Sequence, residues 1–346
     1  MIVFCWEQLP IYAARCIGAF VRTTNEEVVV LRTVTNRFPI KGAAEMTGAK
    51  VIEVKPDNPR SLVEVVGTMP RVIVCGGWAT AAFWRWLKEV KQSGGNTIVC
   101  TDEPYRGRGW YEWVRKIRFN VLFRRYIDMM FVVGRGGVLK FADYYGMASD
   151  NVVDGVYAGD PELFYDGLPI TQRAKKFIYV GHWDENKNVL RMCRAFAKVQ
   201  RDDWTLEVYG GGPLEGELRK LESDYVHIHG YVNADQLGPM YRDTRCFVLG
   251  SFREQWGVVV HEACMSGCML LLSDRVGAKF DFAMPENSVL FNPESEADFA
   301  HGFRAIMEKT DEAQLAAQAK SVELGSRFSP TIFARNLSQM INKLGS

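Results

Sequence analysis

Short apolar runs alternate with longer segments of helical periodicity along most of the chain, and this alternation constrains the fold more than any other feature. Early examples of the apolar runs are residues 28–31, 50–54 and 71–75, which are rich in β-branched side chains. Such runs predict buried strands, and the segments between them predict helices or turns. Because strands that alternate with helices pair in parallel, the sequence predicts an α/β protein built on parallel sheets.

The chain has 346 residues, a length that suits about two domains with separate cores. Residues 159–173 are rich in Asp, Pro and Gly, and we expect the linker between the domains there. The predicted domain boundaries are residues 1–164 for the first domain and residues 165–330 for the second.

One βαβ unit in the second half gathers polar side chains at the end of a strand. Its first strand, residues 246–249, leads into a loop that holds Glu254, and Gly257 then opens a helix that carries Glu262. A second apolar run follows at residues 269–272. Ligands of such sheets bind at the carboxyl ends of the strands, and the first amides of a helix suit a diphosphate. Carboxylates on either side of that helix start suit sugar hydroxyls, so this unit predicts a nucleotide-sugar site.

This pattern resembles the donor site of the family 4 retaining glycosyltransferases, which have the GT-B fold. The residues that carry the resemblance are Ser251, Glu254, Gly257, Glu262, Ala263 and Gly267. It covers most of residues 130–335 and implies two Rossmann-like, doubly wound domains that face one another across a cleft. It also implies that residues 331–346 form a C-terminal helix that returns to the first domain. The alternative is that both glutamates are ordinary solvated surface residues.

The resemblance assigns phosphate-binding roles to a loop near the start of the second domain. Family members have an arginine there and, five residues later, a lysine; Lys187 matches the lysine, whereas His182 stands in place of the arginine. A histidine can donate hydrogen bonds to phosphate but is only partly charged near neutral pH, and Arg253 is the candidate to compensate. The other residues expected to contact the donor are Gly181, Trp256, Gly257, Val258, Tyr231 and Val232, with Tyr231 stacking on the base.

The implied reaction moves a sugar from a nucleoside diphosphate donor on the second domain to an acceptor hydroxyl on the first, with retention of configuration. Breaking the bond between the anomeric carbon and phosphate places negative charge on the leaving diphosphate, and stabilising that charge is the main catalytic task. We expect Lys187 to perform it, Glu254 to orient the sugar and Glu262 to bind the ribose. Protein cations replace a metal in this scheme, and no cofactor is expected.

Asp102 is the catalytic candidate in the first domain. It follows a strand predicted at residues 97–101, where relatives carry a histidine or an acid near the reacting sugar. We expect it to polarise the acceptor or to stabilise the positive charge that develops on the sugar. Alternatively, Asp102 only caps the following turn.

Residues 106–125 have the most unusual composition in the chain, with seven basic residues and a single acid, Glu112. Trp110, Trp113, Ile117 and Val121 follow helical spacing within this segment. Such a helix can lie in the interface of an anionic bilayer. The commoner alternative is that it packs its aromatic face on the sheet and leaves its charges in solvent.

Composition and the remaining motifs exclude several classes. The eight cysteines lie mostly in apolar runs without CxxC spacing, which predicts buried free thiols rather than disulfides or zinc ligands. The first ten residues lack a basic leader, and no run is long and apolar enough to span a bilayer. No nucleic-acid module accompanies the basic segment, so nucleic acid is not an expected partner. We expect a cytoplasmic protein, peripheral on the inner face of the membrane if the basic helix docks there.

The acceptor implied by the resemblance is a saccharide or lipid-linked saccharide of cell-surface polysaccharide synthesis. Two other functions fit the same fold. A sugar-nucleotide epimerase would use the same donor site, and a membrane-docked scaffold with a decayed site is suggested by His182 and by the lack of glycines after the first strand. Retention of Glu254, Glu262 and Lys187 argues against the scaffold.

Overall fold

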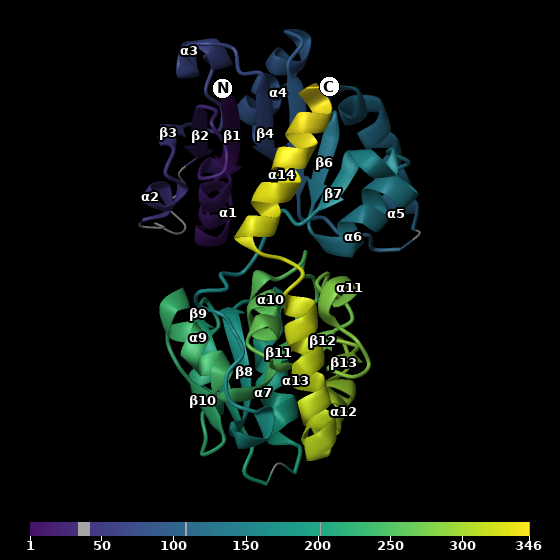
Figure 1. The fold of residues 1–346 in the computed structure, drawn as a ribbon. Coiled ribbons are helices and arrows are strands. Elements are labelled where there is room, and N and C mark those ends of the chain that lie inside the picture. Colours follow the sequence, from purple (N-terminus) through teal and green to yellow (C-terminus); the bar gives the residue numbers. More distant parts are fainter. Residues whose placement is uncertain (34–41, 108, 201, 346) are drawn as a thin grey trace. The chain divides into compact units, whose positions relative to one another are not determined.

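The computed structural model divides into two compact units, which are drawn in Figure 1. The first unit comprises Met1–Ala158 and Phe328–Ser346, and the second comprises Gly159–Arg327. The structure describes residues 1–33, 42–107, 109–200 and 202–345.

The first unit is built on a parallel sheet that has seven strands among the described residues, in the order β3-β2-β1-β4-β5-β6-β7. The strands are β1 (Ile2–Glu7), β2 (Val28–Thr33), β3 (Lys50–Val54), β4 (Val72–Gly76), β5 (Asn96–Thr101), β6 (Met129–Val132) and β7 (Val152–Asp154). The order reverses between β1 and β4, which is the topological switch point of a doubly wound sheet.

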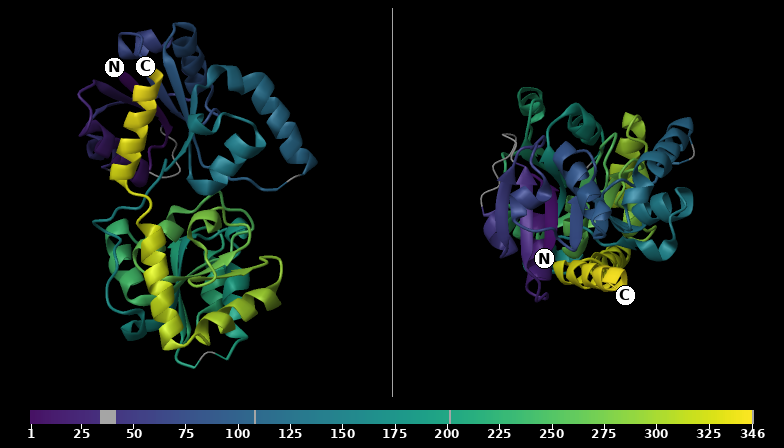
Figure 2. Two further views of the ribbon diagram at one scale, coloured as in Figure 1. Left: turned by 45° about the vertical axis from the view of Figure 1, so that its right-hand side comes forward. Right: turned by 90° about the horizontal axis from the view of Figure 1, so that it is seen from above.

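Helices of the first unit bury side chains such as Phe83 and Trp86 against this sheet. They are α1 (Ile11–Val21), α2 (Ala43–Thr47), α3 (Leu62–Val66), α4 (Ala81–Gln92), α5 (Trp110–Arg118), α6 (Gly134–Val138) and α14 (Pro330–Gly345). The C-terminal helix α14 runs along α1, as the views in Figures 1 and 2 show. Its Phe333 ring stacks on Phe131 at 5.1 Å, and Asn336 donates a hydrogen bond to the Asp154 carbonyl at 3.0 Å. The last helix of the chain is therefore part of the first unit.

The second unit repeats the same topology with six strands among the described residues, in the order β10-β9-β8-β11-β12-β13. The strands are β8 (Ala174–His182), β9 (Thr205–Gly211), β10 (Val226–Ile228), β11 (Thr244–Leu249), β12 (Met269–Ser273) and β13 (Ser288–Phe291). The register pairs Phe177 with Cys246 and Ile178 with Phe247, so the carboxyl ends of β8 and β11 are neighbours. The strand order reverses between these two strands. Both sheets confirm the predicted pair of Rossmann-like, doubly wound domains.

Seven α-helices of the second unit lie among the described residues, and several begin at side-chain caps. They are α7 (Val189–Ala197), α8 (Glu215–Leu218), α9 (Ala234–Arg242), α10 (Val258–Met265), α11 (Lys279–Phe282), α12 (Glu296–Met307) and α13 (Asp311–Gly325). Ser295 accepts the Asp298 amide at 3.0 Å before α12, and Thr310 accepts the Ala313 amide at 3.2 Å before α13. These caps satisfy amides that have no partner within their own helix.

The second unit begins at Gly159, whereas the sequence predicts the boundary after Phe164 and a linker over residues 159–173. The amide of Gly159 donates to His261, and the Phe164 ring lies 5.9 Å from Tyr241. Ile170 donates its amide to Gln318 at 2.8 Å. The expected linker is therefore packed onto the second unit, because its polar turns find partners there.

The eight cysteines are all among the described residues, and each is buried and free, as predicted. Within the part of the chain that the structure describes, no helix has the length and hydropathy needed to cross a membrane.

The segment predicted at residues 106–125 is only partly α-helical. After α5 the chain forms a π-helical turn, Phe119–Phe123, and a short 3₁₀ turn, Arg124–Tyr126. Trp110, Trp113, Ile117 and Val121 are exposed to solvent, by 72%, 59%, 43% and 63%. The expectation that this aromatic face packs on the sheet is therefore wrong.

Candidate active site

The switch point of the second unit places two loops side by side. One loop follows β8 and leads through a 3₁₀ turn, Glu185–Lys187, into α7. The other follows β11 and leads through Glu254 to α10. In a doubly wound sheet, the crevice at such a point is where ligands bind. The strand order alone therefore indicates where the candidate site lies.

Hydrogen bonds between the two loops hold them in register. Asn186 donates its side-chain amide to the Arg253 carbonyl at 2.8 Å and accepts the Phe252 amide at 2.8 Å. Asn188, which is buried and has a φ of 59°, donates to the Gly250 carbonyl at 3.2 Å. Asparagine is one of the few side chains that tolerates this left-handed conformation. These contacts place the residue between the two asparagines, Lys187, opposite the second loop.

Lys187 and Glu254 form an ion pair at the centre of the candidate site. Their side chains are only 23% and 15% exposed. Ser251 donates its hydroxyl to the same carboxylate oxygen at 3.3 Å. An ammonium has three N–H donors, so the bond to Glu254 leaves two for another acceptor. The structure thus brings together two predicted catalytic residues that are 67 positions apart in the chain.

Helix α10 begins directly after this loop, at a residue that only glycine fits. Gly257 has a φ of 93°, and a Cβ there would lie 3.3 Å from the Glu254 side chain. Among the described residues no side chain caps this helix. Its first amides and the positive end of its dipole suit an anion, and Val258 is the first residue of the helix.

Trp256 supports this helix start from behind rather than offering a surface to a ligand. Its side chain is 2% exposed, and its indole N–H donates to Asp281 at 2.7 Å. Its ring lies 5.3 Å from Phe282. The Trp256 side chain therefore positions the loop, and a contact of its backbone with the donor stays a prediction.

Glu262 lies one turn into α10 and is half-buried. Its side chain lies beside Gly159, where an added Cβ would approach the Glu262 Cγ to 3.3 Å. Burial, and to a smaller extent the charge of Glu262, raises the pKa of Tyr241. Because α10 runs from Val258 to Met265, Glu262 lies on the same short helix as the predicted phosphate site, one turn further along.

His261, which the sequence analysis passed over, ties α10 to both ends of the second unit. Its Nδ1 accepts the Gly159 amide at 2.9 Å, so its Nε2 carries the proton and donates to the Gly325 carbonyl at 2.8 Å. Complete burial lowers the pKa of His261 to about 4, outweighing the opposing effect of the bond to Gly325. The histidine is therefore neutral near pH 7. Only its position directly before Glu262 could have drawn attention to it in the sequence.

The remaining residues predicted around the phosphate lie at the ends of the two loops. His182 is exposed at the end of β8, where its carbonyl accepts the Tyr179 hydroxyl at 2.8 Å. Gly181 pairs in register with Gly210, whose Cβ, if present, would lie 1.9 Å from the Gly181 carbonyl oxygen. Arg253 is exposed next to Glu254. The side chains of His182 and Arg253 are thus both exposed, and their contacts with phosphate stay a prediction.

The predicted base-binding residues follow β10. The Tyr231 side chain is 80% exposed, and Val232 is half-buried. An exposed aromatic ring on a loop can stack on a base, so stacking by Tyr231 stays a prediction.

Asp102 belongs to the first unit, where it follows β5 and is half-buried. Burial is the main cause that raises the pKa of Tyr157, and the charges of Tyr12 and Asp102 add to it. Asp102 therefore lies near Tyr12 and Tyr157, whose rings are 5.1 Å apart, at the carboxyl end of its sheet. Its catalytic role stays a prediction.

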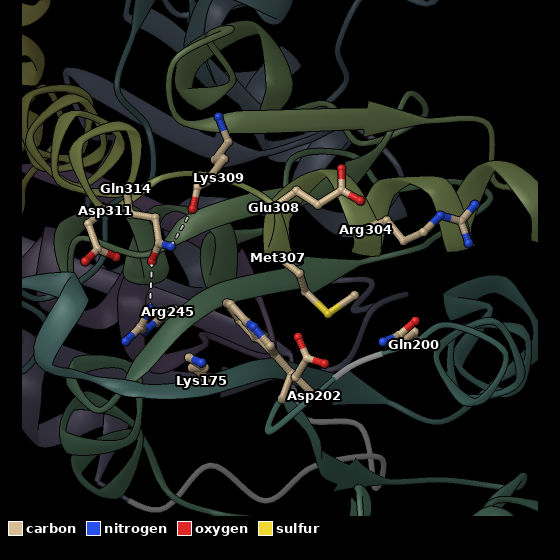
Figure 3. Close-up of a pocket in the computed structure, with 11 residues that line it drawn as sticks. Lys175, Gln200, Asp202, Arg245, Arg304, Met307, Glu308, Lys309, Asp311 and Gln314 are labelled. Carbon is tan, nitrogen blue, oxygen red and sulfur yellow. Dashed lines mark hydrogen bonds between the residues drawn. The ribbon is translucent and has the colours of Figure 1, made fainter.

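A separate pocket of about 400 Å³ lies at the opposite end of the second sheet, near the first residues of β8 and β11 (Figure 3). Its wall is already hydrogen-bonded: Arg245 donates to Gln314 at 3.1 Å, and Gln314 donates to the Lys309 carbonyl at 2.9 Å. Because ligands of these sheets bind at the carboxyl ends of the strands, we do not assign the donor to this pocket. Among the described residues, no group of histidine, cysteine and acidic side chains is arranged to hold a metal ion.

Comparison with known proteins agrees with this topology. A family model described as "Glycosyl transferases group 1" matches residues 165–322. An uncharacterized glycosyltransferase, MJ1607 of Methanocaldococcus jannaschii, is 24% identical over 151 residues, which are 42% of this chain and 38% of that relative. The matched region thus spans well under half of that protein.

Solved structures extend the likeness over both units. Anabaena HepE in complex with UDP has a TM-score of 0.76 at 14% identity, with 99% of each chain covered. Sucrose-phosphate synthase of Thermosynechococcus elongatus has a TM-score of 0.73 at 15% identity, again with 99% of each chain covered. The comparisons support the predicted enzyme class, a glycosyltransferase. The chain has the GT-B fold, and its residues 165–322 match the model of the glycosyl transferases group 1 family.

Proposed function

We propose that the protein is a retaining glycosyltransferase that moves a sugar from a nucleoside diphosphate donor to a hydroxyl of a saccharide or lipid-linked saccharide. The observation that carries the proposal is the Lys187–Glu254 pair beside the uncapped start of α10, at the switch point of the second unit. The structure of HepE, which has the same fold, was solved with UDP. That complex supports a nucleoside diphosphate as the donor class.

The geometry suggests how the donor would be held. The diphosphate would accept hydrogen bonds from the first amides of α10 and from the two remaining donors of Lys187. His182 and Arg253, both exposed at the ends of the same loops, would supply further hydrogen bonds. Glu262, one turn along α10, would accept from the ribose hydroxyls. Binding thus needs only groups of the second unit.

The reaction would depend on stabilising the leaving diphosphate. Donors fixed in place before the bond breaks are most effective, because no reorganisation is needed in the transition state. The cross-linked loops hold Lys187 in this way. Glu254 already accepts from Lys187 and Ser251, which makes its carboxylate a poor nucleophile and suits it to orienting the sugar. Asp102 of the first unit would polarise the acceptor hydroxyl.

The acceptor and the location are also part of the proposal. We place the enzyme in the cytoplasm, with a lipid-linked acceptor at the inner face of the membrane and a role in cell-surface polysaccharide synthesis. The exposed aromatic residues of α5 in the first unit support a lipid-linked acceptor, because such a surface is compatible with contact to a bilayer.

Thermal-shift measurements with UDP-, GDP- and ADP-sugars test the donor class. One donor should raise the melting temperature in a concentration-dependent way, because a ligand that binds only the folded state stabilises it. Glu262→Gln should weaken that donor about tenfold by removing a charged hydrogen bond of roughly 1.5 kcal/mol. The exposed Glu217→Gln is the matched control and should bind the donor normally.

Product analysis then tests the chemistry. Transfer to an acceptor with the anomeric configuration of the donor supports a retaining transferase, and inverted product contradicts it. Conversion of the donor to an isomer without any acceptor would identify an epimerase instead. If no nucleoside diphosphate shifts the melting temperature, the site is not a donor site and the scaffold alternative replaces the enzyme.

A further inference from the structure

The first unit has an apolar surface whose side chains are exposed to solvent and do not pack into the core of that unit. We call it the aromatic face, and its members are Trp110, Tyr111, Trp113, Val114, Ile117, Val121 and Leu122 of α5 and the π-helical turn after it. Their exposed fractions run from 43% for Ile117 to 72% for Trp110. In the left-hand view of Figure 2, this helical segment stands out from the sheet of the first unit. Exposed apolar surfaces of this extent mark sites of interaction.

The orientation of α5 is set by charges and not by its apolar side chains. Within α5, which is described in full, the one buried residue is Glu112. It lies 3.7 Å from the ammonium of Lys140, which is itself only 1% exposed, and 3.3 Å from Arg115. Glu103 completes the cluster, at 2.8 Å from Lys140 and 3.0 Å from Arg115. The helix is thus inverted, with an ionic cluster centred on the buried Glu112 and Lys140 on its inner side and large apolar groups on its outer side.

This inversion is informative because a helix that only needed to cover the sheet would bury its tryptophans. Leaving large apolar side chains in water forgoes the stabilisation that their burial would provide. The buried ion pairs that replace them contribute little net stability. The arrangement therefore costs stability in the isolated chain, and it is explained if the aromatic face is covered by a partner during function.

An apolar groove lies at one edge of the aromatic face and shares Trp113, Ile117 and Val121 with it. Its volume is about 340 Å³. It is lined by Trp113, Lys116, Ile117, Asn120, Val121 and Tyr144. The ammonium of Lys116 lies 5.0 Å over the Tyr144 ring, at the edge of this groove. An apolar slot with a cation at its rim matches one acyl chain and the phosphate to which it is attached.

Basic residues surround the aromatic face. Arg106, Arg118 and Arg125 are exposed, and Lys116 and Arg124 are half-buried. Arg108 also belongs to this segment but lies outside the described residues. The only acid of residues 106–125, Glu112, is turned inward against Lys140. The exposed part of the segment is therefore positive and apolar together, which is complementary to an anionic membrane surface.

We propose that the aromatic face docks onto the surface of a bilayer that contains anionic phospholipid. The tryptophan and tyrosine rings would lie at the boundary between head groups and acyl chains, where aromatic residues are favoured. Ile117 and Val121 would reach the acyl chains, and the groove would accept one of them. The basic residues would contact lipid phosphates. This inference needs only the surface of the first unit and does not depend on sugar transfer.

The composition of the face favours lipid over other partners. Single-stranded nucleic acid needs aromatic rings spaced for base stacking, whereas Val114, Ile117, Val121 and Leu122 offer no such platform. A second copy of the chain would bring two positive rims together across a symmetric contact, which electrostatic repulsion opposes. An anionic bilayer satisfies the apolar centre and the positive rim at once.

Sedimentation of the full-length protein with vesicles tests the proposal. The protein should sediment with vesicles of phosphatidylcholine and phosphatidylglycerol, weakly with phosphatidylcholine alone, and less in high salt. The variant Trp113→Ser/Ile117→Ser/Val121→Ser should bind the anionic vesicles at least about tenfold more weakly, because each truncation removes apolar area from the contact. Arg118→Gln should weaken binding about fivefold, the factor that corresponds to about 1 kcal/mol per basic residue.

Matched controls separate docking from general changes of the surface. Leu168→Ser/Leu290→Ser removes two side chains of the second unit that are 60% and 47% exposed, and it should sediment like the unchanged protein. All variants should keep the melting temperature and the response to the sugar-nucleotide donor, since the Glu112–Lys140 anchor is intact. A failed donor response in the unchanged protein would count against the proposed function alone.

Three outcomes would overturn the docking proposal. The first is that the unchanged protein does not sediment with anionic vesicles. The second is that the triple variant sediments as well as the unchanged protein. The third is a stable dimer in lipid-free solution that the triple variant dissolves, without any vesicle binding, which would assign the aromatic face to a second copy of the chain.

Discussion

The two units have the same strand order, yet their switch points differ in chemistry. In the second unit, the loop after β11 contains Gly257, which has a φ of 93° and opens an uncapped helix. In the first unit, the loop after β1 contains Gln8 and Leu9 with φ values of 58° and 45°, where a glycine would be unstrained. There Glu7 binds the Thr80 hydroxyl, and Leu9 is fully buried. In the second unit, the turn at the switch point therefore leads to helix amides that can bind a ligand. In the first unit, the side chains of the corresponding turn already contact other groups of the protein.

Helices α5 and α10 extend the contrast. Helix α10 buries His261 and apolar residues, and its polar contributions are its amino end and Glu262. Helix α5 buries Glu112 and exposes its apolar residues. Topology places both helices after a strand, but the side chains decide which part of each is available to a partner. Substitutions that separate these roles test the comparison.

The largest effect is expected from Lys140→Met in the first unit. Removing this ammonium leaves the buried Glu112 and the half-buried Glu103 with less positive charge, which should destabilise the unit by about 3 to 5 kcal/mol. Hydrogen exchange of the α5 amides and the thermal midpoint of the first unit would report the loss. The control is Trp113→Ala, which should change stability by less than about 0.5 kcal/mol because its side chain is exposed. A larger effect of Trp113→Ala would show that α5 is held by its apolar side.

A large effect on activity is expected from Lys187→Ala in the second unit. Loss of one fixed donor to the leaving group should lower kcat by about 10² to 10³. The control Lys198→Ala removes a lysine of the same unit that is 70% exposed and paired with Glu296, and its kcat should be unchanged. Turnover of Lys187→Ala equal to that of the control would remove Lys187 from the site.

The pH dependence of stability should reveal His261. Its pKa falls from 6.5 to about 4 on folding because the buried ring resists protonation. The unfolded chain therefore binds a proton at a higher pH than the folded one, and the contribution to stability is complete above pH 6.5 and lost as the pH falls toward about 4. The loss amounts to roughly 3 kcal/mol. In His261→Gln, the free energy of unfolding should change less with pH in this window than in the unchanged protein. In His301→Gln, whose histidine is exposed, the pH dependence should stay the same. Equal slopes in all three proteins would contradict a buried neutral His261.

Features that depend on local pattern were predictable from the sequence. The alternation of strands and helices predicts both parallel sheets, because hydrophobic periodicity is a property of short segments. Lys187 and Glu254 each follow the end of a predicted strand. If these two strands are adjacent in the sheet, the two side chains are expected to lie close together. The sheet register supplies that adjacency.

Features that depend on contacts between distant residues were not predictable. The inward turn of α5 depends on Lys140, which pairs with Glu112 of this helix and with Glu103, 37 residues earlier in the chain. His261 takes its partners from Gly159 and Gly325, at separations of 102 and 64 residues. Neither contact leaves a periodic signal, because a single long-range polar bond involves no repeated pattern. The burial of Trp256 is similar, since it depends on Asp281 of a later helix.

The smallest effect is expected at the strained turn of the first unit. Gln8 has a φ of 58°, a conformation that costs a non-glycine residue about 1 to 2 kcal/mol. Gln8→Gly removes this cost and adds about 0.5 to 1 kcal/mol of backbone entropy lost on folding, so a net stabilisation of about 0.5 to 1 kcal/mol is expected. Gln92→Gly, at the end of α4, is the matched control and should destabilise by up to about 1 kcal/mol. If thermal unfolding shows that Gln8→Gly is stabilised and Gln92→Gly is destabilised, the turn after β1 is strained because a residue other than glycine occupies it. If both variants lose stability, the Gln8 side chain must make a contact worth more than the strain.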